Sequence, residues 1–480
     1  MFRCIVPLPI FAATCIRAAT LAVPAEYSTI QAALHTASQG DTVLVAPGTY
    51  TGSGNRDLDF GGLDLTLVSR EGADATIIEC EKSGRGVHFD KGESQAARVD
   101  GFTIRNGNAR IGGGINCHES SPTIANCIIQ NGSTTSNGGG ITAYKSSLVI
   151  ANCIIEHNKT DQEGGAIYLG SSNATITGCT FSNNSAGTEG GGIFLHDSRE
   201  TQISHSSIRG NSATIRAAGI HCYNRSHPTI TNCMITDNEG PEQGGGVCCG
   251  FNSDPTIANC TFANNTAGSG GGAYCGEESH PTFVNCIFWD NVPNSVERYF
   301  SFATLTYCDV EGGYAGEGNF VANPLFVGSG SGDYHLSASS PCIDAGTADG
   351  APTDDYEGDA RPQDQAVDVG ADEYVALELG LSDYGSTYSP NDDLTFTIEI
   401  ENTDSKGHGL TRGIFWSMSP EFELTLYDGA EFMIGGGDIF TYPFSLTIPG
   451  RAPLGSYTVG VTIYNGDTEL SSTSFEFEMD

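Results

Sequence analysis

Hydrophobic and polar positions repeat through the middle of the chain with a regular period, which the recurring small-residue runs mark most clearly. Each repeat holds short apolar runs, a polar loop and a run of small residues, as residues 120–141 show in full. The apolar runs are too short for helices and are rich in Ile, Thr and Phe, which favours strands. A fixed period without helical patterning is typical of a solenoid, in which stacked repeats share one core. The small-residue run ends at Gly114, Gly140, Ala166, Gly192, Gly219, Gly246 and Gly272.

Each repeat accommodates three strands, so that one repeat forms one coil. In the first strand, residues 115–118, alternation turns Ile115 and Cys117 inward and Asn116 and His118 outward. The second strand, at 122–125, and the third, at 127–131, are separated by the single residue Asn126. Asparagine accepts the left-handed backbone conformation, so a one-residue corner is predicted there. The same corner is expected at Asn152, Asn232, Asn259 and Asn285.

Stacking the coils at about 4.8 Å places equivalent residues in columns. Cysteines separated by a whole repeat do not form a local zinc-binding motif, whose cysteines lie close together in sequence. Because cysteine packs well as a small apolar residue, an interior cysteine column is predicted. Alternation turns Cys248 outward instead. An outer asparagine ladder is expected to satisfy backbone groups at the corners. The interior column contains Cys127, Cys153, Cys179, Ser206, Cys233, Cys260, Cys286 and Cys308, and the ladder contains Asn158, Asn184, Asn211, Asn238, Asn265 and Asn291.

The two ends of the chain differ from the repeats. Arg3, an apolar stretch and small residues near Ala18 predict an export signal, and no later stretch is apolar and long enough to span a membrane. Residues 27–40 predict a short amphipathic helix, starting at Ser28 or Thr29, that caps the first coil. The predicted organisation is a signal peptide at 1–22, a parallel β-helix at 23–343, an Asp/Gly-rich end segment and linker at 344–375, and an immunoglobulin-like β-sandwich at 376–480.

The net charge of −37 makes nucleic acids and anionic membranes poor partners. Residues 344–480 contain 27 Asp and Glu but only 4 Lys and Arg. Calcium is therefore the one cofactor that the composition suggests, because the acidic run at 354–368 supplies the hard oxygen ligands that calcium prefers. That run lacks an Asp-x-Asp-x-Asp-Gly loop, so a solvated acidic surface without a cofactor is the expectation. The candidate ligands are Asp354, Asp355, Glu357 and Asp359.

Three parts of the sequence resemble secreted bacterial right-handed parallel β-helix proteins of the pectate-lyase-like superfamily. They are "VPAEYSTIQAALHTASQGDTVLVAPGTY" at 23–50, the repeated "PTI" and "NC" before "GGGI", and the closing "NPLF", "GDYHL", "SPCIDAG" and "AVDVGADEY". The likeness covers roughly residues 20–375 and implies a right-handed all-β helix of three strands per coil. The repeats at 164–167, 181–184 and 262–265 also resemble those of chlamydial polymorphic outer-membrane proteins, which implies surface adhesion.

In enzymes of that superfamily, substrate lies along the outside of the strand that here follows the glycines. The outward positions of this strand are unusually rich in aromatic and histidine side chains, which suit stacking on a polymer of sugars. Cross-strand ring pairs that merely stabilise the sheet are the alternative. The predicted ligand-binding residues are Tyr144, Tyr168, Phe194, His196, His221, Tyr223 and Tyr274.

The leading hypothesis is therefore a secreted or cell-surface protein that binds polysaccharide, or adheres to a surface, without catalysis. A polysaccharide lyase or glycoside hydrolase is the second hypothesis, with His118, His196, His221 and Arg225 as candidate catalytic residues. Lyases need a base with a cation and hydrolases need paired carboxylates, yet no Asp cluster spans neighbouring coils and the loops are short. A spacer that displays the sandwich is the third hypothesis. The sequence makes no prediction of oligomeric state.

Overall fold

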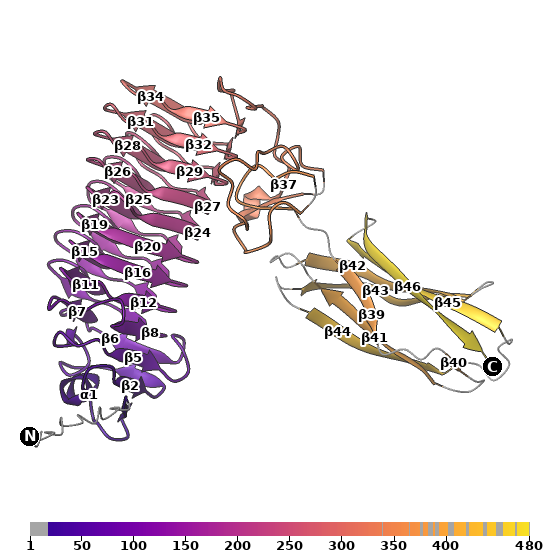
Figure 1. The fold of residues 1–480 in the computed structure, drawn as a ribbon, viewed down its shortest axis with the longest axis horizontal. Coiled ribbons are helices and arrows are strands. Elements are labelled where there is room, and N and C mark those ends of the chain that lie inside the picture. The colour runs from indigo at the N-terminus through magenta and orange to yellow at the C-terminus, as the bar shows by residue number, and fades with distance from the viewer. Residues whose placement is uncertain are drawn as a thin grey trace, which may run out of the picture.

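The protein is a right-handed parallel β-solenoid of about 11 turns (Figure 1). The computed structural model describes residues 18–374 apart from Ala338 and Asp364, and beyond them the backbone of eight strands between 378 and 479. Positions 1–17 of the predicted signal peptide lie outside the described residues. Strand β1 (Thr20–Val23) already pairs with β2 (Thr42–Val45), so the end of the segment assigned to the signal belongs to the first coil.

The strand that follows the glycines builds one ten-stranded parallel sheet, called the glycine-side sheet below. Its register advances by one coil per strand, so that Ile115, Ile141 and Ile167 are direct neighbours. These isoleucines are fully buried, because alternation turns them into the solenoid. The strands are β4 (Leu58–Asp59), β7 (Val87–Phe89), β11 (Ile115–His118), β15 (Ile141–Tyr144), β19 (Ile167–Gly170), β23 (Ile193–His196), β26 (Ile220–Tyr223), β28 (Val247–Gly250), β31 (Ala273–Gly276) and β34 (Val296–Tyr299).

The second and third strands of the coils join in one 21-stranded sheet, because β24 and β27 run through the corner and each pairs with both a second and a third strand of a neighbouring coil. Asn126 occupies that corner with φ 52°, and the four predicted equivalents have φ between 47° and 53°. The one-residue asparagine corner is thus confirmed. The strands other than β1 and β2 are β3 (Gly48–Tyr50), β5 (Thr66–Ser69), β6 (Thr76–Glu79), β8 (Arg98–Asp100), β9 (Thr103–Arg105), β12 (Thr123–Ala125), β13 (Ile128–Gln130), β16 (Ser147–Ala151), β17 (Ile154–Glu156), β20 (Asn173–Thr177), β21 (Thr180–Ser182), β24 (Gln202–Arg209), β27 (Thr229–Thr236), β29 (Thr256–Ala258), β30 (Thr261–Ala263), β32 (Thr282–Val284), β33 (Ile287–Trp289), β35 (Thr304–Thr306) and β36 (Asp309–Val310).

The loop between the third strand and the next glycines contains a small five-stranded sheet. Its two-residue strands are β10 (Asn108–Ala109), β14 (Ser133–Thr134), β18 (Lys159–Thr160), β22 (Ser185–Ala186) and β25 (Ser212–Ala213). At the first coil, helix α1 (Ile30–Thr36) buries Ile30, Ala33 and Leu34 against the solenoid, and the Thr29 hydroxyl accepts a hydrogen bond from Ala32 N at 3.3 Å. No helix in the described part of the chain has the length and hydropathy needed to cross a bilayer.

Two columns of equal residues fill the interior. The cysteine column is buried along its whole length and its thiols are free, so the prediction of a packing role is confirmed. The asparagine ladder is also interior, which corrects the prediction that it is an outer one. Asn158 donates from Nδ2 to the Ile129 carbonyl at 2.9 Å and to Asn184 Oδ1 at 3.1 Å. The predicted function of the ladder, satisfying backbone groups, is therefore exercised inside the core.

Residues after the last coil fold back along the outside of the 21-stranded sheet (Figure 1). The part from 325 to 374, called the end segment below, contains an antiparallel pair, β37 (Phe326–Gly328) and β38 (Asp333–Leu336), with a 3-10 turn, η1 (Ser329–Ser331), between them. Ala371 N donates to Thr261 Oγ1 at 3.1 Å, and Asn285 Nδ2 donates to the Thr347 carbonyl at 2.8 Å. The end segment thus packs laterally on the coils.

Several acidic residues of the end segment are buried, whereas Asp354, Glu357 and Asp359 are partly exposed, so the expectation of a solvated acidic surface is corrected in part. Asp355, Asp368, Asp372 and Glu373 expose at most 2% of their surface. Asp355 Oδ1 accepts hydrogen bonds from the backbone N–H groups of residues 357, 358 and 359, at 2.8–2.9 Å. A buried carboxylate is tolerated when it accepts such bonds, because they replace its hydration.

Eight further strands follow, and they form one three-stranded and one five-stranded sheet. Only their backbone is described, so the immunoglobulin-like sandwich at 376–480 stays a prediction. The strands are β39 (Glu378–Ser382), β40 (Thr387–Tyr388), β41 (Asp393–Glu401), β42 (His408–Met418), β43 (Phe422–Ile434), β44 (Ile439–Thr447), β45 (Gly455–Asn465) and β46 (Thr468–Met479).

Candidate functional site

A row of aromatic and histidine rings follows the glycine-side sheet from coil to coil. The last residues of successive strands are in register, which stacks His118 on Tyr144 and His196 on Tyr223. In the coil between these two pairs, Gly170 occupies the equivalent position at the end of the strand. The ring of Tyr168, from the same strand, lies over Gly170. A Cβ at Gly170 would lie 2.8 Å from Tyr168 Cε1, so glycine is needed there to admit the ring. The ring row consists of His118, Tyr144, Tyr168, His196, Tyr223 and Phe251.

The rings contact one another at distances close to one coil spacing. The centroids of His118 and Tyr144 are 5.6 Å apart and stacked, those of His196 and Tyr223 are 5.7 Å apart, and those of Tyr223 and Phe251 are 4.7 Å apart. Tyr144 and Phe251 are 40% and 42% exposed. The remaining members are half-buried, except His118, which is exposed. The row therefore presents ring faces and edges to solvent over several coils.

Three residues predicted to bind ligand do not belong to this exposed row. Phe194, His221 and Tyr274 expose 3%, 1% and 7% of their surface, and the neighbouring Cys248 exposes 2%. They face outward by alternation, but the loop that precedes each strand folds over them. At Gly190, with φ 67°, the loop passes so close that an added Cβ would lie 2.7 Å from Phe194 Cβ. The expectation that Phe194, His221 and Tyr274 belong to an exposed row was wrong, because alternation indicates only the direction of a side chain and not whether a loop covers it.

A charged cluster lies beside the ring row. Glu163, Glu189 and Arg216 occupy equivalent loop positions one coil apart, each directly before the small residues of its coil: Gly138 N donates to the Glu163 carbonyl, and Gly164 N to that of Glu189. Glu189 Oε1 is 3.1 Å from Arg216 Nε and Glu189 Oε2 is 3.2 Å from His221 Nδ1. The structure thus unites two carboxylates, a guanidinium and an imidazole on one face.

The two carboxylates of this cluster have opposite pKa shifts. Burial, followed by the negative charge of Glu189, raises the pKa of Glu163 above its ordinary 4.5. Burial also acts to raise the pKa of Glu189, but its contacts with His221 and the charge of Arg216 outweigh burial and lower the pKa. One carboxyl group therefore holds its proton more strongly than usual, and its neighbour ionises more readily.

The predicted catalytic residues are not assembled into one site. His118 and His196 lie on β11 and β23, three coils apart, and Arg225 is exposed in the turn after β26. Only His221 contacts a carboxylate of the charged cluster. Sequence reasoning missed Glu163, Glu189, Arg216 and Phe251, although Glu163 and Glu189 each stand directly before a glycine pair, one repeat apart. Aligning the loops as well as the strands would have found them.

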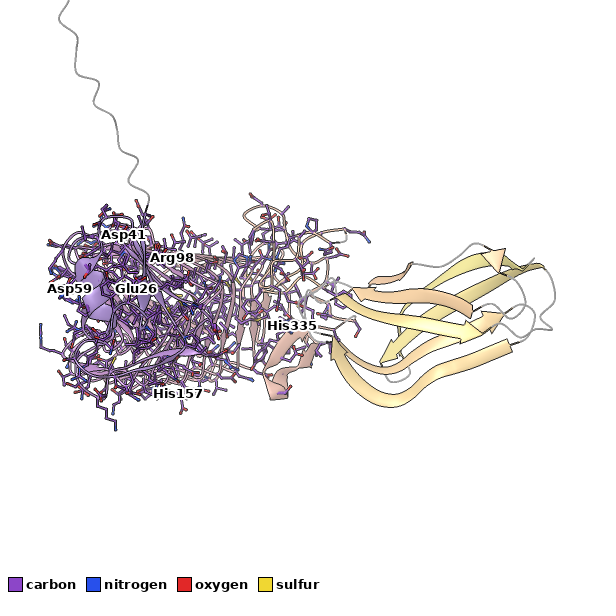
Figure 2. The ribbon with its side chains drawn as sticks, turned by 90° about the horizontal axis from the view of Figure 1, so that it is seen from below. Glu26, Asp41, Asp59, Arg98, His157 and His335 are labelled. Carbon is purple, nitrogen blue, oxygen red and sulfur yellow. The ribbon has the colours of Figure 1, made fainter. Side chains whose placement is uncertain are left out.

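The four candidate calcium ligands are also separated. Asp354 Oδ1 lies 3.3 Å from His205 Nε2, while Asp355 is engaged by backbone N–H groups as described above. Glu357 instead pairs with His335, and Figure 2 places His335 well apart from Asp41 and Asp59 near the first coils. The structure therefore does not unite Asp354, Asp355, Glu357 and Asp359 in one calcium site.

Comparison with known proteins agrees with the geometry. The model of a family described as "Right handed beta helix region" matches residues 67–227 and 213–338, which together cover more than half of the chain. No curated protein and no solved structure matches the sequence. The matched residues coincide with the coils that carry the ring row and the charged cluster, and the chain belongs to the right-handed β-helix family.

Proposed function

We propose that the protein binds polysaccharide along the ring row, as a secreted or cell-surface binding protein. The observation that carries this proposal is the row of exposed and half-buried rings from His118 to Phe251, in which three neighbouring pairs have ring centroids 4.7–5.7 Å apart. Aromatic rings bind through flat apolar area and keep a polar edge in contact with water. Successive coils are about 4.8 Å apart, so the rings repeat on the length scale of single sugar units in an extended polymer.

The surrounding charges restrict the kind of glycan. Glu163, Glu189 and Glu277 lie at the row, where Arg216 is 3.1 Å from Glu189 and 3.8 Å from Glu277. Lys145 lies 5.4 Å from the centre of the Tyr144 ring and pairs with a further carboxylate, Glu119, at 3.0 Å. An excess of carboxylates repels polyanions, and the net charge of the chain acts in the same direction. We therefore infer that a neutral polysaccharide is preferred to a uronic acid polymer.

The remaining features fit a display role outside the cell. Within this proposal residues 1–22 supply the export signal, α1 caps the first coil, and strands β39–β46 build an immunoglobulin-like module at the other end. Surface adhesion through the same row is the related alternative, as the resemblance to polymorphic outer-membrane repeats suggests. A pure spacer role for the solenoid predicts no binding at the row, which separates it from both.

The first prediction concerns binding. Replacing Tyr144 and Tyr168 together with alanine removes the two tyrosines around Gly170, and we expect a loss of affinity for the preferred glycan of about 5- to 150-fold. The expected loss follows from two stacking contacts of about 0.5–1.5 kcal/mol each. Retention of purified protein on a neutral glycan array and on polygalacturonate, followed by titration of the best ligand, measures it.

The matched control is Ile154→Ala in the same coil. Ile154 is 40% exposed, like Tyr144, but it lies on β17 in the 21-stranded sheet. The control should bind glycan as the wild type does. Equal affinity of the tyrosine double variant and the wild type, with both folded by circular dichroism, would show that the row is not the binding surface.

A glycoside hydrolase is the second candidate function, because the charged cluster supplies what a hydrolase needs. Hydrolysis of a glycosidic bond uses one protonated and one ionised carboxyl group. Glu163, with its raised pKa, suits the general acid, and Glu189, with its lowered pKa, suits the ionised partner. His221 and Arg216 would then act as positioning residues that keep Glu189 ionised. A polysaccharide lyase remains the alternative, but no comparable pair of pKa shifts supports it.

If hydrolysis occurs, we expect Glu163→Gln to lower kcat at least 100-fold while glycan affinity changes little, because general acid catalysis contributes about 10²–10⁴. The acid must be protonated, so activity is expected to fall as pH rises through the raised pKa of Glu163. It should also fall as pH drops through the lowered pKa of Glu189. Release of reducing ends from the glycan identified by binding measures both limbs, and unchanged turnover in Glu163→Gln would exclude this assignment.

A further inference from the structure

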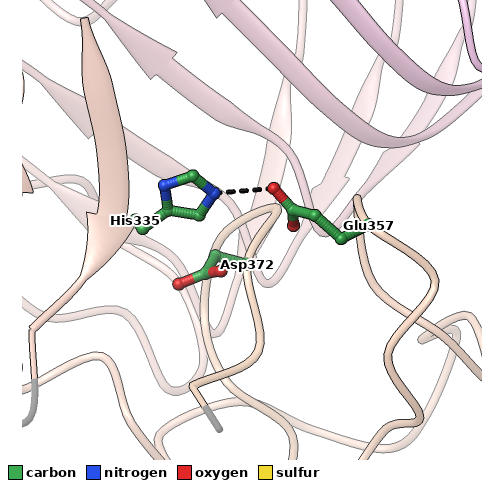
Figure 3. Close-up of side chains that lie close together, drawn as sticks. All are labelled: His335, Glu357 and Asp372. Atoms are coloured by element: carbon green, nitrogen blue, oxygen red, sulfur yellow. Dashed lines mark hydrogen bonds and ion pairs between the residues drawn. The ribbon is translucent and has the colours of Figure 1, made fainter. Parts of the chain in front are cut away.

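Three side chains of the end segment converge at a point remote from the ring row (Figure 3). His335 comes from β38, while Glu357 and Asp372 come from two later loops. One potential ligand atom from each lies within 4.8 Å of the others, and His335 Nε2 is 2.6 Å from Glu357 Oε1. The other imidazole nitrogen, Nδ1, contacts the Asp333 carboxylate. That contact directs Nε2 toward Glu357 and Asp372.

The second oxygen of Glu357 has no hydrogen-bond partner. The Glu357 side chain is 10% exposed and its Oε2 atom is fully buried. Buried carboxylate oxygens normally accept hydrogen bonds, because an unsatisfied one has lost its hydration without replacement. Burial accordingly raises the pKa of Glu357. Oε2 belongs to the Glu357 carboxylate, which lies beside His335 and Asp372 in Figure 3. The carboxylate oxygen that lacks a hydrogen-bond donor is therefore part of the cluster.

The cluster places two carboxylates beside one imidazole. Asp372 is 2% exposed, and its Oδ2 accepts a hydrogen bond from Leu336 N at 2.7 Å. Arg361 binds Glu373 at 2.7 Å and so neutralises a different carboxylate. A divalent ion held by these three side chains would compensate the negative charge of the two carboxylates that the fold brings together here.

We propose that His335 Nε2, Glu357 and Asp372 bind a divalent transition-metal ion, with zinc as the best fit. One imidazole and two carboxylates are a donor set that zinc accepts in a four-coordinate site, with one position left for water. Calcium and magnesium favour sites made of oxygen ligands alone. The Asp333 carboxylate on Nδ1 is the outer contact that metal-binding histidines usually have, which fixes the ring and its tautomer.

Metal binding requires only a small rearrangement of the cluster. Zinc lies about 2.0–2.2 Å from nitrogen and oxygen ligands, which places neighbouring ligands roughly 3.3–3.6 Å apart. The ion would take the place of the proton between His335 and Glu357, whose atoms separate slightly, while Asp372 approaches. Because the three ligands come from three separate parts of the end segment, the ion would join β38 to both loops. Its expected effect is to stabilise the end segment on the coils.

The test uses the purified full chain after removal of metal with a chelator. We expect one zinc or cobalt ion per chain, with an increase in Tm of several degrees on saturation. His335→Gln and Glu357→Gln should each weaken binding at least tenfold and abolish most of the Tm increase. Cobalt spectra distinguish this site from the cysteines, since nitrogen and oxygen ligation gives d–d bands without a thiolate charge-transfer band.

His205→Gln is the matched control. His205 also pairs with an end-segment carboxylate, at 3.3 Å from Asp354 Oδ1, but without a second one. The control should bind cobalt like the wild type. The proposal is overturned if the wild type binds no zinc or cobalt, if the cobalt spectrum shows thiolate ligation, or if calcium binds as tightly as zinc. The wild-type measurements decide the question even if a variant fails to fold.

Discussion

Asn211→Ala is expected to lower the free energy of unfolding by about 4 kcal/mol, more than any surface substitution in the solenoid. Asn211 is fully buried in the asparagine ladder. Its Oδ1 accepts hydrogen bonds from Asn184 N at 3.0 Å and from Asn184 Nδ2 at 3.0 Å, and its Nδ2 donates to the Phe181 carbonyl at 3.0 Å. Truncation leaves Asn184 N buried and unpaired, at about 1–3 kcal/mol, and removes the other three hydrogen bonds of this amide, at about 0.5–1.5 kcal/mol each.

Urea unfolding followed by circular dichroism measures this loss. The control is Asn152→Gly, at an exposed corner with φ 53°. Glycine adopts positive φ without strain, so the control should lose less than about 1 kcal/mol. Asn211→Asp adds a second test, since it keeps the shape but places an acceptor opposite the Phe181 carbonyl. If Asn211→Ala were as stable as Asn152→Gly, the ladder would not hold the coils together.

Arg361→Met is expected to release the end segment from the coils. Arg361 is buried, and its guanidinium donates to Glu373 Oε2 at 2.7 Å, to the Ala371 carbonyl at 2.7 Å and to the Gly370 carbonyl at 3.1 Å. Methionine keeps the apolar stem but leaves Glu373, which is 1% exposed, as an unpaired buried charge. Removing one partner of such a pair costs about 3–5 kcal/mol.

Hydrogen–deuterium exchange separates this local effect from global unfolding. Peptides from 325–374 should exchange at least 100-fold faster in Arg361→Met, while those from the first coils keep their protection. Arg98→Met is the control, because Arg98 is 39% exposed and pairs with Asp100 at 2.8 Å on the surface. Such a pair contributes about 0–1 kcal/mol. Unchanged exchange in the end segment would mean that Arg361 does not anchor it.

The solenoid could be predicted from sequence because its structure repeats with the sequence. Each coil contributes the same residues at the same register, so Asn126 and Cys127 could be assigned by comparing copies within one chain. The corner asparagines follow from a local backbone preference, and the cysteine column follows from packing. Neither depends on contacts between distant parts of the chain.

The end segment could not be predicted in this way, because it has no internal repeat. From sequence its acidic residues are expected to be solvated. Only the fold shows that Asp355 accepts backbone hydrogen bonds and that Arg361 forms an ion pair with Glu373. The charged cluster was missed for a related reason. Alternation indicates that Phe194 and His221 face outward, but the cover over them and the carboxylates beside them come from loops, whose path the strand pattern does not specify.

Because the end segment packs on the side of the coils, the length of the ring row can vary without any change in the junction between the end segment and the coils. The contacts named above join it to His205, Thr261 and Asn285, all at or after β24, whereas the ring row begins at His118. Duplication or loss of a whole coil between His118 and β24 would therefore lengthen or shorten the ring row without altering that junction. Descendants of one ancestral gene could in this way acquire faces matched to longer or shorter polymers.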